Sequence, residues 1–207
     1  MKASLHYFLM LLAFIGLMNS AMSFAGSSPL KVKKGELLFS DDFERKFGER
    51  EWISGEKFDG AFSIDEGAYP IKELKGAGHG SVSRIMVDYA DIVLEFDLKF
   101  DGGLRFNLVL DDGNFKPVWA GHIARVSFSK SGFTVQDDKT GTMNLKIREQ
   151  LKKDPSLKEG KLKKYLEARK SFAKHKFEEG EWYHVTITKM GDILECRVGD
   201  SIAQVKS

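Results

Sequence analysis

Hydrophobic and polar residues alternate along two neighbouring stretches of the chain, Ile92 to Phe100 and Leu104 to Asp111. In the first stretch apolar residues occupy every second position from residue 94 onward, and charged residues stand between them. A period of two is typical of a strand with one buried face, because successive side chains of a strand point to opposite sides. Turn-forming residues fill positions 101 to 103. We therefore predict an antiparallel β-hairpin with Glu95 and Asp97 on its polar face.

Short alternating runs, separated by turns rich in Gly and Asp, continue along the rest of the chain. The predicted strands, by residue number, are 36–41, 61–64, 68–71, 80–85, 92–100, 104–111, 122–129, 132–136, 182–188, 193–198 and 201–205. Many short strands at such spacing are typical of an all-β protein, an antiparallel β-sandwich or jelly roll. Aromatic side chains dominate core burial, so Trp52 and Trp182 are predicted core residues.

The N-terminus has the pattern of a secretory signal peptide. Lys2 precedes an apolar run from Leu5 to Met18, and the small residues Ser23 and Ala25 precede a cleavage position before Gly26. The run is shorter than the roughly 20 residues that a membrane-spanning helix needs. We expect a signal peptide over 1–25, a linker over 26–37 and one sandwich domain over 38–207, secreted or periplasmic, with no stable membrane span after cleavage.

The chain has a single cysteine, Cys196, so no intrachain disulfide can form. It alternates with Leu194 and Val198 and is therefore predicted to point into the core as a small hydrophobe. A secreted protein without disulfides must be stabilised by packing, which fits a bacterial envelope.

Charge is concentrated in one segment, 145–176. This segment holds twelve basic and four acidic residues, a net charge of +8, whereas the whole chain has +2. Asp154, Pro155 and Ser156 supply a helix start, so the segment is predicted to be a Lys-rich helical insertion interrupted near Gly160. A solvated insertion or a basic flap for an anionic surface would both explain it. Nucleic acid is not an expected partner, because aromatic residues do not interleave with the basic ones.

Several segments, in this order and spacing, resemble one family. They are Leu38 to Arg45, His79 to Arg84, Leu94 to Asp101, Gly121 to Val126, and Gly180 to Tyr183 followed by Gly191-Asp192. The chain from Leu38 onward is similar to the secreted concanavalin A-like, laminin G-like sandwich family labelled 3-keto-disaccharide hydrolase. The resemblance implies a secreted sandwich that acts on glycosidic bonds of 3-keto-disaccharides.

The chain departs from the family pattern in two places. The pattern continues past Gly199-Asp200 with two more strands, so either C-terminal strands are missing or the sandwich closes differently. The Lys-rich insertion is also longer than the connection that such domains place before Trp182.

Hydrolysis of a glycosidic bond needs two carboxyl groups, one protonated and one ionised. Glu95 and Asp97 share a strand face, with α-carbons about 6.5–7 Å apart, and His122 is a candidate base. We name these three as candidate catalytic residues. The alternative is that Glu95 and Asp97 only form ion pairs on a solvated sheet face, because Lys99 follows on the same face and Arg105 is expected across the hairpin.

Five other residues are candidate substrate-binding residues: Trp119, Arg125, Arg105, Asn107 and His79. An indole stacks on a sugar ring, and guanidinium and amide groups bind sugar hydroxyls or carboxylates. A loop tryptophan that plugs the end of the core, and a histidine that caps a turn, are the alternatives.

No cofactor or metal site is expected. The segments 111–114 and 137–138 offer oxygen ligands of the kind that calcium takes, but such sequences are more often plain turns. The sequence thus predicts a glycan-recognising sandwich, with a saccharide or envelope polysaccharide as partner. It leaves catalysis open, and the alternative function is a structural or protein-interaction module of the cell envelope.

Overall fold

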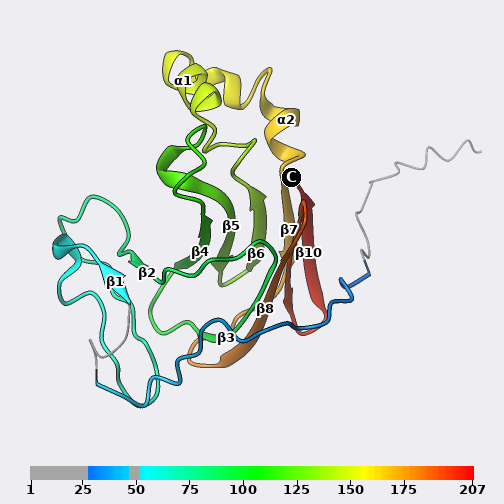
Figure 1. Cartoon of the computed structure of the whole chain (residues 1–207). Helices are drawn as coiled ribbons and strands as arrows, with labels where there is room; N and C mark the ends of the chain where they lie inside the picture. Colours follow the sequence, from blue (N-terminus) through cyan, green and yellow to red (C-terminus); the bar gives the residue numbers. More distant parts are fainter. Residues whose placement is uncertain (1–27, 47–51) are drawn as a thin grey trace, which may run out of the picture.

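The computed structural model describes residues 28–46 and 52–207, so the predicted signal peptide lies outside the described residues. The chain forms two four-stranded antiparallel sheets packed face to face, which confirms the predicted all-β sandwich (Figure 1). The first, here called the β8 sheet, has the order β10-β9-β8-β3. Its strands are β3 (Ile92–Lys99), β8 (Trp182–Met190), β9 (Ile193–Val198) and β10 (Ser201–Lys206).

The second sheet, here called the β5 sheet, has the order β4-β5-β6-β7. Its strands are β4 (Arg105–Asp111), β5 (His122–Ser129), β6 (Gly132–Asp137) and β7 (Lys170–Lys174). Neighbours in both sheets are mostly consecutive in the chain, but β3 pairs with β8 across the long intervening segment.

The predicted hairpin between β3 and β4 is wrong. β3 pairs with β8, and β4 pairs with β5, so segment 100–104 carries the chain from one sheet to the other. Both strands still have the predicted alternation, because each contributes one face to the core between the sheets. Arg105 therefore does not lie across a hairpin from Lys99.

The core between the sheets consists of large apolar residues from both layers. Phe128, Phe133 and Val185 are completely buried, and Phe96 and Phe106 pack against them from opposite sheets with ring centroids 6.0 Å apart. Edge-to-face packing of this kind stabilises aromatic pairs by about 0.5–1.5 kcal/mol beyond their burial. Cys196 belongs to this core and is fully buried, as predicted.

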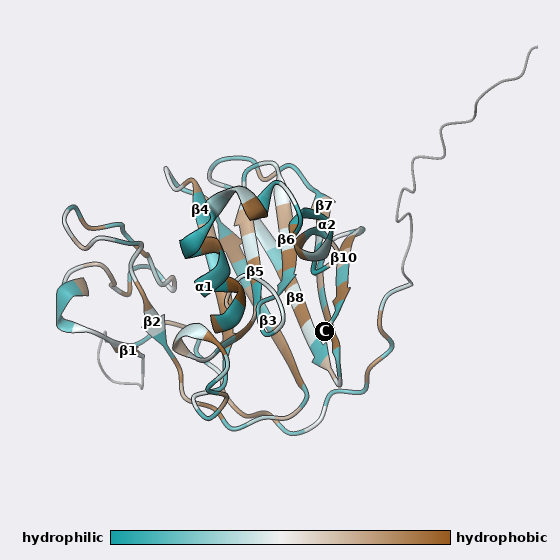
Figure 2. Cartoon of the chain, turned by 90° about the horizontal axis from the view of Figure 1, so that it is seen from above, coloured by the Kyte–Doolittle hydropathy of each residue, from teal (hydrophilic) through white to brown (hydrophobic). Residues whose placement is uncertain are grey.

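The Lys-rich segment forms helices at one end of the sandwich (Figures 1 and 2). They are α1 (Leu145–Lys153), the 3-10 helix η3 (Pro155–Lys158) and α2 (Lys163–Glu167). The side chain of Asp154 accepts a hydrogen bond from Ser156 N, which confirms the predicted start. The insertion ends earlier than the predicted residue 176, because β7 begins at Lys170 and pairs with β6.

Residues 52–91 form loops beside the sandwich, with the short strands β1 (Ile53–Ser54) and β2 (Ser83–Arg84) and the 3-10 helix η1 (Glu56–Phe58). The predicted strands at 61–64 and 68–71 are reduced to isolated bridges, and 36–41 is not a strand. Trp52 packs in this region against Tyr69, with ring centroids 4.6 Å apart. Trp182, predicted to be buried, is 53% exposed.

The N-terminal segment crosses the outer face of the β8 sheet (Figure 1). Leu30 N donates to Glu195 Oε2 at 2.9 Å, and Lys34 pairs with Glu95. Glu195 is consequently almost completely buried. Among the described residues, no helix is long and apolar enough to cross a membrane.

Candidate functional site

The outer face of the β5 sheet brings together most of the predicted binding residues. We call this surface the polar face; its residues are Arg105, Asn107, Val109, Asp111, His122, Arg125, Ser127, Ser129, Thr134, Gln136, Lys170, Phe172 and Lys174. They alternate with core residues such as Leu110, Val126 and Val135, which point between the sheets. The alternation of four strands thus places twelve of these side chains on one side of one sheet, and the register shift at Asp111 adds His122.

Strand register arranges these side chains in rows. Val109, Arg125, Gln136 and Lys170 are successive partners across β4, β5, β6 and β7. Adjacent strands lie about 4.8 Å apart, so such a row spans roughly 14 Å. The next row holds Asn107, Ser127, Thr134 and Phe172. Short hydroxyl side chains therefore occupy the middle of the face, with longer ones around them.

His122 lies at one end of the polar face and is held by Asp111. Its Nδ1 is 2.5 Å from Asp111 Oδ1, and Arg84 approaches the other carboxylate oxygen at 3.7 Å. A β-bulge between Leu110 and Asp111 sets this pairing. Within residues 28–46 and 52–207, Nε2 of His122 has no hydrogen-bond partner. The ring is therefore oriented by a carboxylate and has one nitrogen left for a ligand.

The side chain of Tyr89 packs against the core, and its hydroxyl group lies near Asp111 and Asp112. It is buried, and no hydrogen-bond partner for it is found in the described part of the chain. Burial raises the pKa of Tyr89 above its usual value, and the nearby carboxylates of Asp111 and Asp112 raise it further. Tyr89 is thus a neutral phenol beside the Asp111–His122 pair.

Arg125 lies within the row of Val109, Gln136 and Lys170, and a buried carboxylate holds its side chain in place. Its Nε and Nη2 both donate to Asp138 Oδ2, at 2.9 and 2.7 Å. Asp138 is completely buried, and its other oxygen accepts a hydrogen bond from Gln136 Nε2 at 2.6 Å. Gln136 Nε2 also lies 3.0 Å from Thr142 Oγ1. Charge-assisted bonds to a buried carboxylate fix the guanidinium in one place.

Trp119 stands in the loop that leads into β5, in the 3-10 turn η2 (Trp119–Gly121). Ala120 has a φ of 54°, which turns the chain sharply there, while Val118 is buried and forms a bridge with Asn144. The indole is 55% exposed, and the Arg148 guanidinium of α1 lies 5.1 Å from its ring centroid. Trp119 therefore does not plug the core, and its ring is accessible in the turn that leads into β5 at His122.

Glu95 and Asp97 lie on the other sheet, so they are not brought together with His122. They project from β3 on the outer face of the β8 sheet, where His184 is the register partner of Asp97. His184 Nδ1 is 2.9 Å from Asp97 Oδ1, and its Nε2 is 4.0 Å from Glu95 Oε1. Because Lys34 also pairs with Glu95, both carboxylates belong to an exposed ion-pair network.

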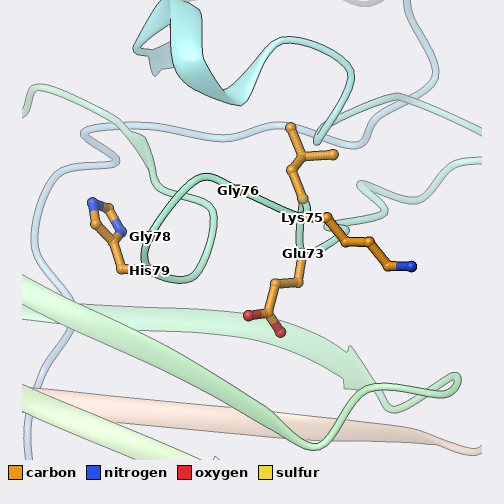
Figure 3. Close-up of a pocket in the computed structure, with 6 residues that line it drawn as sticks. Glu73, Lys75, Gly76, Gly78 and His79 are labelled. Atoms are coloured by element: carbon orange, nitrogen blue, oxygen red, sulfur yellow. The ribbon is translucent and has the colours of Figure 1, made fainter.

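His79 also lies away from the polar face, in a loop near η1. Its Nε2 is 2.8 Å from Lys57 Nζ, and its ring packs against Phe58. The loop lines an open cavity of about 440 Å³, drawn in Figure 3. There Glu73, Lys75 and His79 point in different directions, so they do not converge on one ligand position.

Sequence reasoning did not name Gln136, which lies on the polar face, or His184, which pairs with Asp97 on the other sheet. Gln136 lies within the predicted strand 132–136 and has the same parity as Thr134, so the alternation of β6 already indicates its place on the polar face. Arg84 and His184 depend on contacts between segments far apart in the chain, which the alternation pattern does not contain.

The oxygen-rich turns are occupied by internal hydrogen bonds. Asp112 Oδ1 accepts from Asn114 N, Asp137 accepts from Thr140, and Asp138 binds Arg125. Over the described ranges, no group of three or more His, Cys, Asp or Glu side chains is arranged to hold a metal ion.

The chain is thus an antiparallel β-sandwich with a face of mainly polar side chains on one sheet. No protein-family model, curated protein or solved structure matches it significantly. The resemblance to the 3-keto-disaccharide hydrolase family consequently stays a prediction.

Proposed function

We propose that the protein is a secreted saccharide-binding module and that the polar face of the β5 sheet binds the sugar. The observation that carries the proposal is the anchored Arg125 and the oriented His122 on one sheet face, with the exposed indole of Trp119 three residues before His122 in the chain. A sugar ring has apolar C–H faces and a rim of hydroxyl groups, so its sites combine an aromatic platform with fixed polar groups.

The fixed polar groups suit hydroxyl recognition because they include both donors and acceptors. Arg125 supplies N–H donors, Asn107 supplies an amide with both functions, and His122 has one nitrogen open. Anchoring by Asp138 and Asp111 reduces the entropy that these side chains lose when a ligand binds.

Hydrolysis is a second candidate function, favoured by the Asp111–His122 pair. A histidine oriented through Nδ1 by a carboxylate leaves Nε2 to take a proton from water or a sugar hydroxyl. Glu95 and Asp97 do not join this pair, since they lie on the other sheet. If the protein is a hydrolase, His122→Asn should abolish reducing-sugar release, whereas Asp97→Asn should leave it unchanged.

Export is part of the proposal and is supported by the N-terminal pattern of Lys2, the apolar run and Ala25. Fusing residues 1–30 to a reporter that is active only outside the cytoplasm tests it. Loss of reporter activity on replacing Leu11 and Leu12 by Asp would support export. Activity that persists in this variant would contradict it.

Saccharide binding can be tested with two tryptophans of nearly equal exposure. Trp119 is 55% exposed in the turn that leads into β5, and Trp182 is 53% exposed at the start of β8 in the other sheet. Titration calorimetry with a panel of oligosaccharides should show affinity reduced about tenfold or more by Trp119→Ala, equivalent to about 1.4 kcal/mol. Trp182→Ala is the matched control and should bind as the parent does.

Two results would contradict the proposal. A loss of affinity confined to Trp182→Ala would place the saccharide on the β8 sheet. Absence of binding and of product across the whole panel would favour the alternative, a structural or protein-interaction module of the envelope.

A further inference from the structure

A second cavity opens where the Lys-rich insertion meets the polar face. It has a volume of about 370 Å³. The helices α2 and η3 form one wall, and the end of the β5 sheet forms the other. Arg125, Gln136 and Lys170, which form one row across β5, β6 and β7, line its sheet side. Ligand sites commonly have volumes of about 300–1,000 Å³, so this space suits one or two sugar rings.

Cations outnumber carboxylates in the lining of this cavity. The five cations are Arg125, Lys158, Lys163, Arg169 and Lys170. Three acidic residues, Asp137, Glu159 and Glu167, also line it. The surrounding segment 145–176 carries a net charge of +8, so the positive potential extends beyond the cavity itself.

Two of the three carboxylates are engaged by the protein itself. Asp137 is buried, with its oxygens accepting hydrogen bonds from the backbone and the hydroxyl of Thr140. Glu159 lies 3.6 Å from Lys163, with both side chains exposed. Asp137 and Glu159 therefore do not form ion pairs with the other cations that line the cavity.

The five cations also differ in how far other groups of the protein engage them. Arg169 is structural, because its Nε donates to Thr140 Oγ1 and its Nη1 to Tyr165 O. Lys158 and Lys170 form no ion pair with any residue in ranges 28–46 and 52–207. Arg125 uses Nε and Nη2 on Asp138, so its Nη1 remains for a ligand. Three cationic side chains around one cavity thus have N–H groups available to a ligand.

We infer that this cavity binds the anionic group of an acidic saccharide, a carboxylate or a sulfate ester, whose neighbouring rings lie along the polar face. The inference deepens the proposed function and rests on it. Arg125, held in one orientation by a buried carboxylate, pairs with the planar or tetrahedral anion, and Lys158 and Lys170 supply further charge. The Lys-rich insertion then acts as the wall that selects acidic chains.

The experiment compares three hexasaccharides with one backbone: a galactose hexamer, the corresponding hexagalacturonate and a 6-sulfated galactose hexamer. Titration calorimetry at low salt with the full chain should show at least one charged hexamer binding about tenfold or more tighter than the neutral one. Lys158→Gln should reduce that charged-hexamer affinity about three- to tenfold and leave the neutral hexamer unchanged, and Lys170→Gln should weaken binding of the charged hexamer more than binding of the neutral one. The two charged hexamers distinguish carboxylate from sulfate.

Lys152→Gln is the matched control, because Lys152 is an exposed lysine of α1 outside the cavity. Equal affinity for all three hexamers would overturn the inference and keep the proposed function. An equal effect of Lys152→Gln and Lys170→Gln would also overturn it, since only the general field would then attract the ligand. Charged-hexamer binding that depends on Lys170 but not on Trp119 would uphold the anion site and reject the saccharide-binding face. No binding of any hexamer would overturn both.

Discussion

Arg125 and Asp138 form an ion pair in which two guanidinium nitrogens, Nε and Nη2, share one carboxylate oxygen. Asp138 is completely buried, whereas the side chain of Arg125 is 20% exposed at the polar face. The pair therefore connects the interior of the sandwich to its surface. A buried charge without its partner is costly, so this contact couples the stability of the domain to the orientation of Arg125.

Replacing Asp138 by Asn should destabilise the protein. The substitution removes the charge that compensates Arg125 but keeps an acceptor for Gln136, and we expect a loss of about 2–4 kcal/mol in the free energy of unfolding. Urea denaturation measures it. Asp111→Asn serves as control: its side chain is 31% exposed, so the same change should cost less than about 1 kcal/mol. Equal costs would contradict the role of burial.

Gly132 should not tolerate a side chain. Its φ is +151°, and an added Cβ would lie 2.3 Å from the carbonyl oxygen of Ala173 and 2.7 Å from the Phe172 ring. Gly132→Ala should therefore lower the free energy of unfolding by about 2–4 kcal/mol. Gly199→Ala, at a φ of +55° with open space around it, should cost only about 1–2 kcal/mol. Thermal unfolding of both variants separates the steric clash at Gly132 from the cost of a positive φ alone. Similar losses of stability in the two variants would refute the predicted clash.

Cys196 should make the domain less stable at alkaline pH. Burial raises the pKa of its thiol far above the usual value of 9.0, and Glu195 adds to the shift. The unfolded chain loses this proton above about pH 9 and the folded chain keeps it, so the free energy of unfolding falls as pH rises, by up to about 1.4 kcal/mol per pH unit. Urea denaturation from pH 8 to 10.5 should show a steeper fall for the parent than for Cys196→Ala. Parallel curves would contradict the prediction.

His175 should make the domain less stable at acidic pH. It packs against Phe177, with ring centroids 4.7 Å apart, and burial lowers its pKa below 6.5. The unfolded chain binds a proton at this residue more readily, so stability is lost as pH falls below about 6.5 and the loss ends at the folded-state pKa. The stability of His175→Phe should decline less than that of the parent between pH 7 and 5. A decline as large as the parent's would exclude His175 as the cause.

Alternation was sufficient to predict seven of the eight strands of the two four-stranded sheets, because each has one face against the core. β3, β5 and β9 lie within a residue or so of their predicted ranges. Alternation also placed Arg105, Asn107 and Arg125 on exposed strand faces, and the register of β4 with β5 puts all three on the same surface. It failed for β7, because Lys170–Lys174 follows a helix directly and its charged residues resemble those of the helix.

Partner choice between strands was not predictable from the same pattern. The short segment after Phe100 has the residues of a hairpin turn, yet it crosses to the other sheet, and this separates Glu95 and Asp97 from His122. By contrast, the exposure of Trp182 does follow from alternation, because Tyr183, Val185 and Ile187 face the core and Trp182 points to the opposite side, where Lys99 lies over its ring at 4.8 Å.

The sequence by itself determined most of the sandwich strands, the buried face of each of these strands and the place where positive charge accumulates, because these properties depend on neighbours a few positions away. Tertiary structure alone decided which strands pair, and hence that Asp111 orients His122, that Asp138 anchors Arg125 and that the Lys-rich insertion walls a cavity beside them. The physical reason is that pairing between distant segments is selected by the packing of the whole core, and a local pattern is compatible with several such pairings.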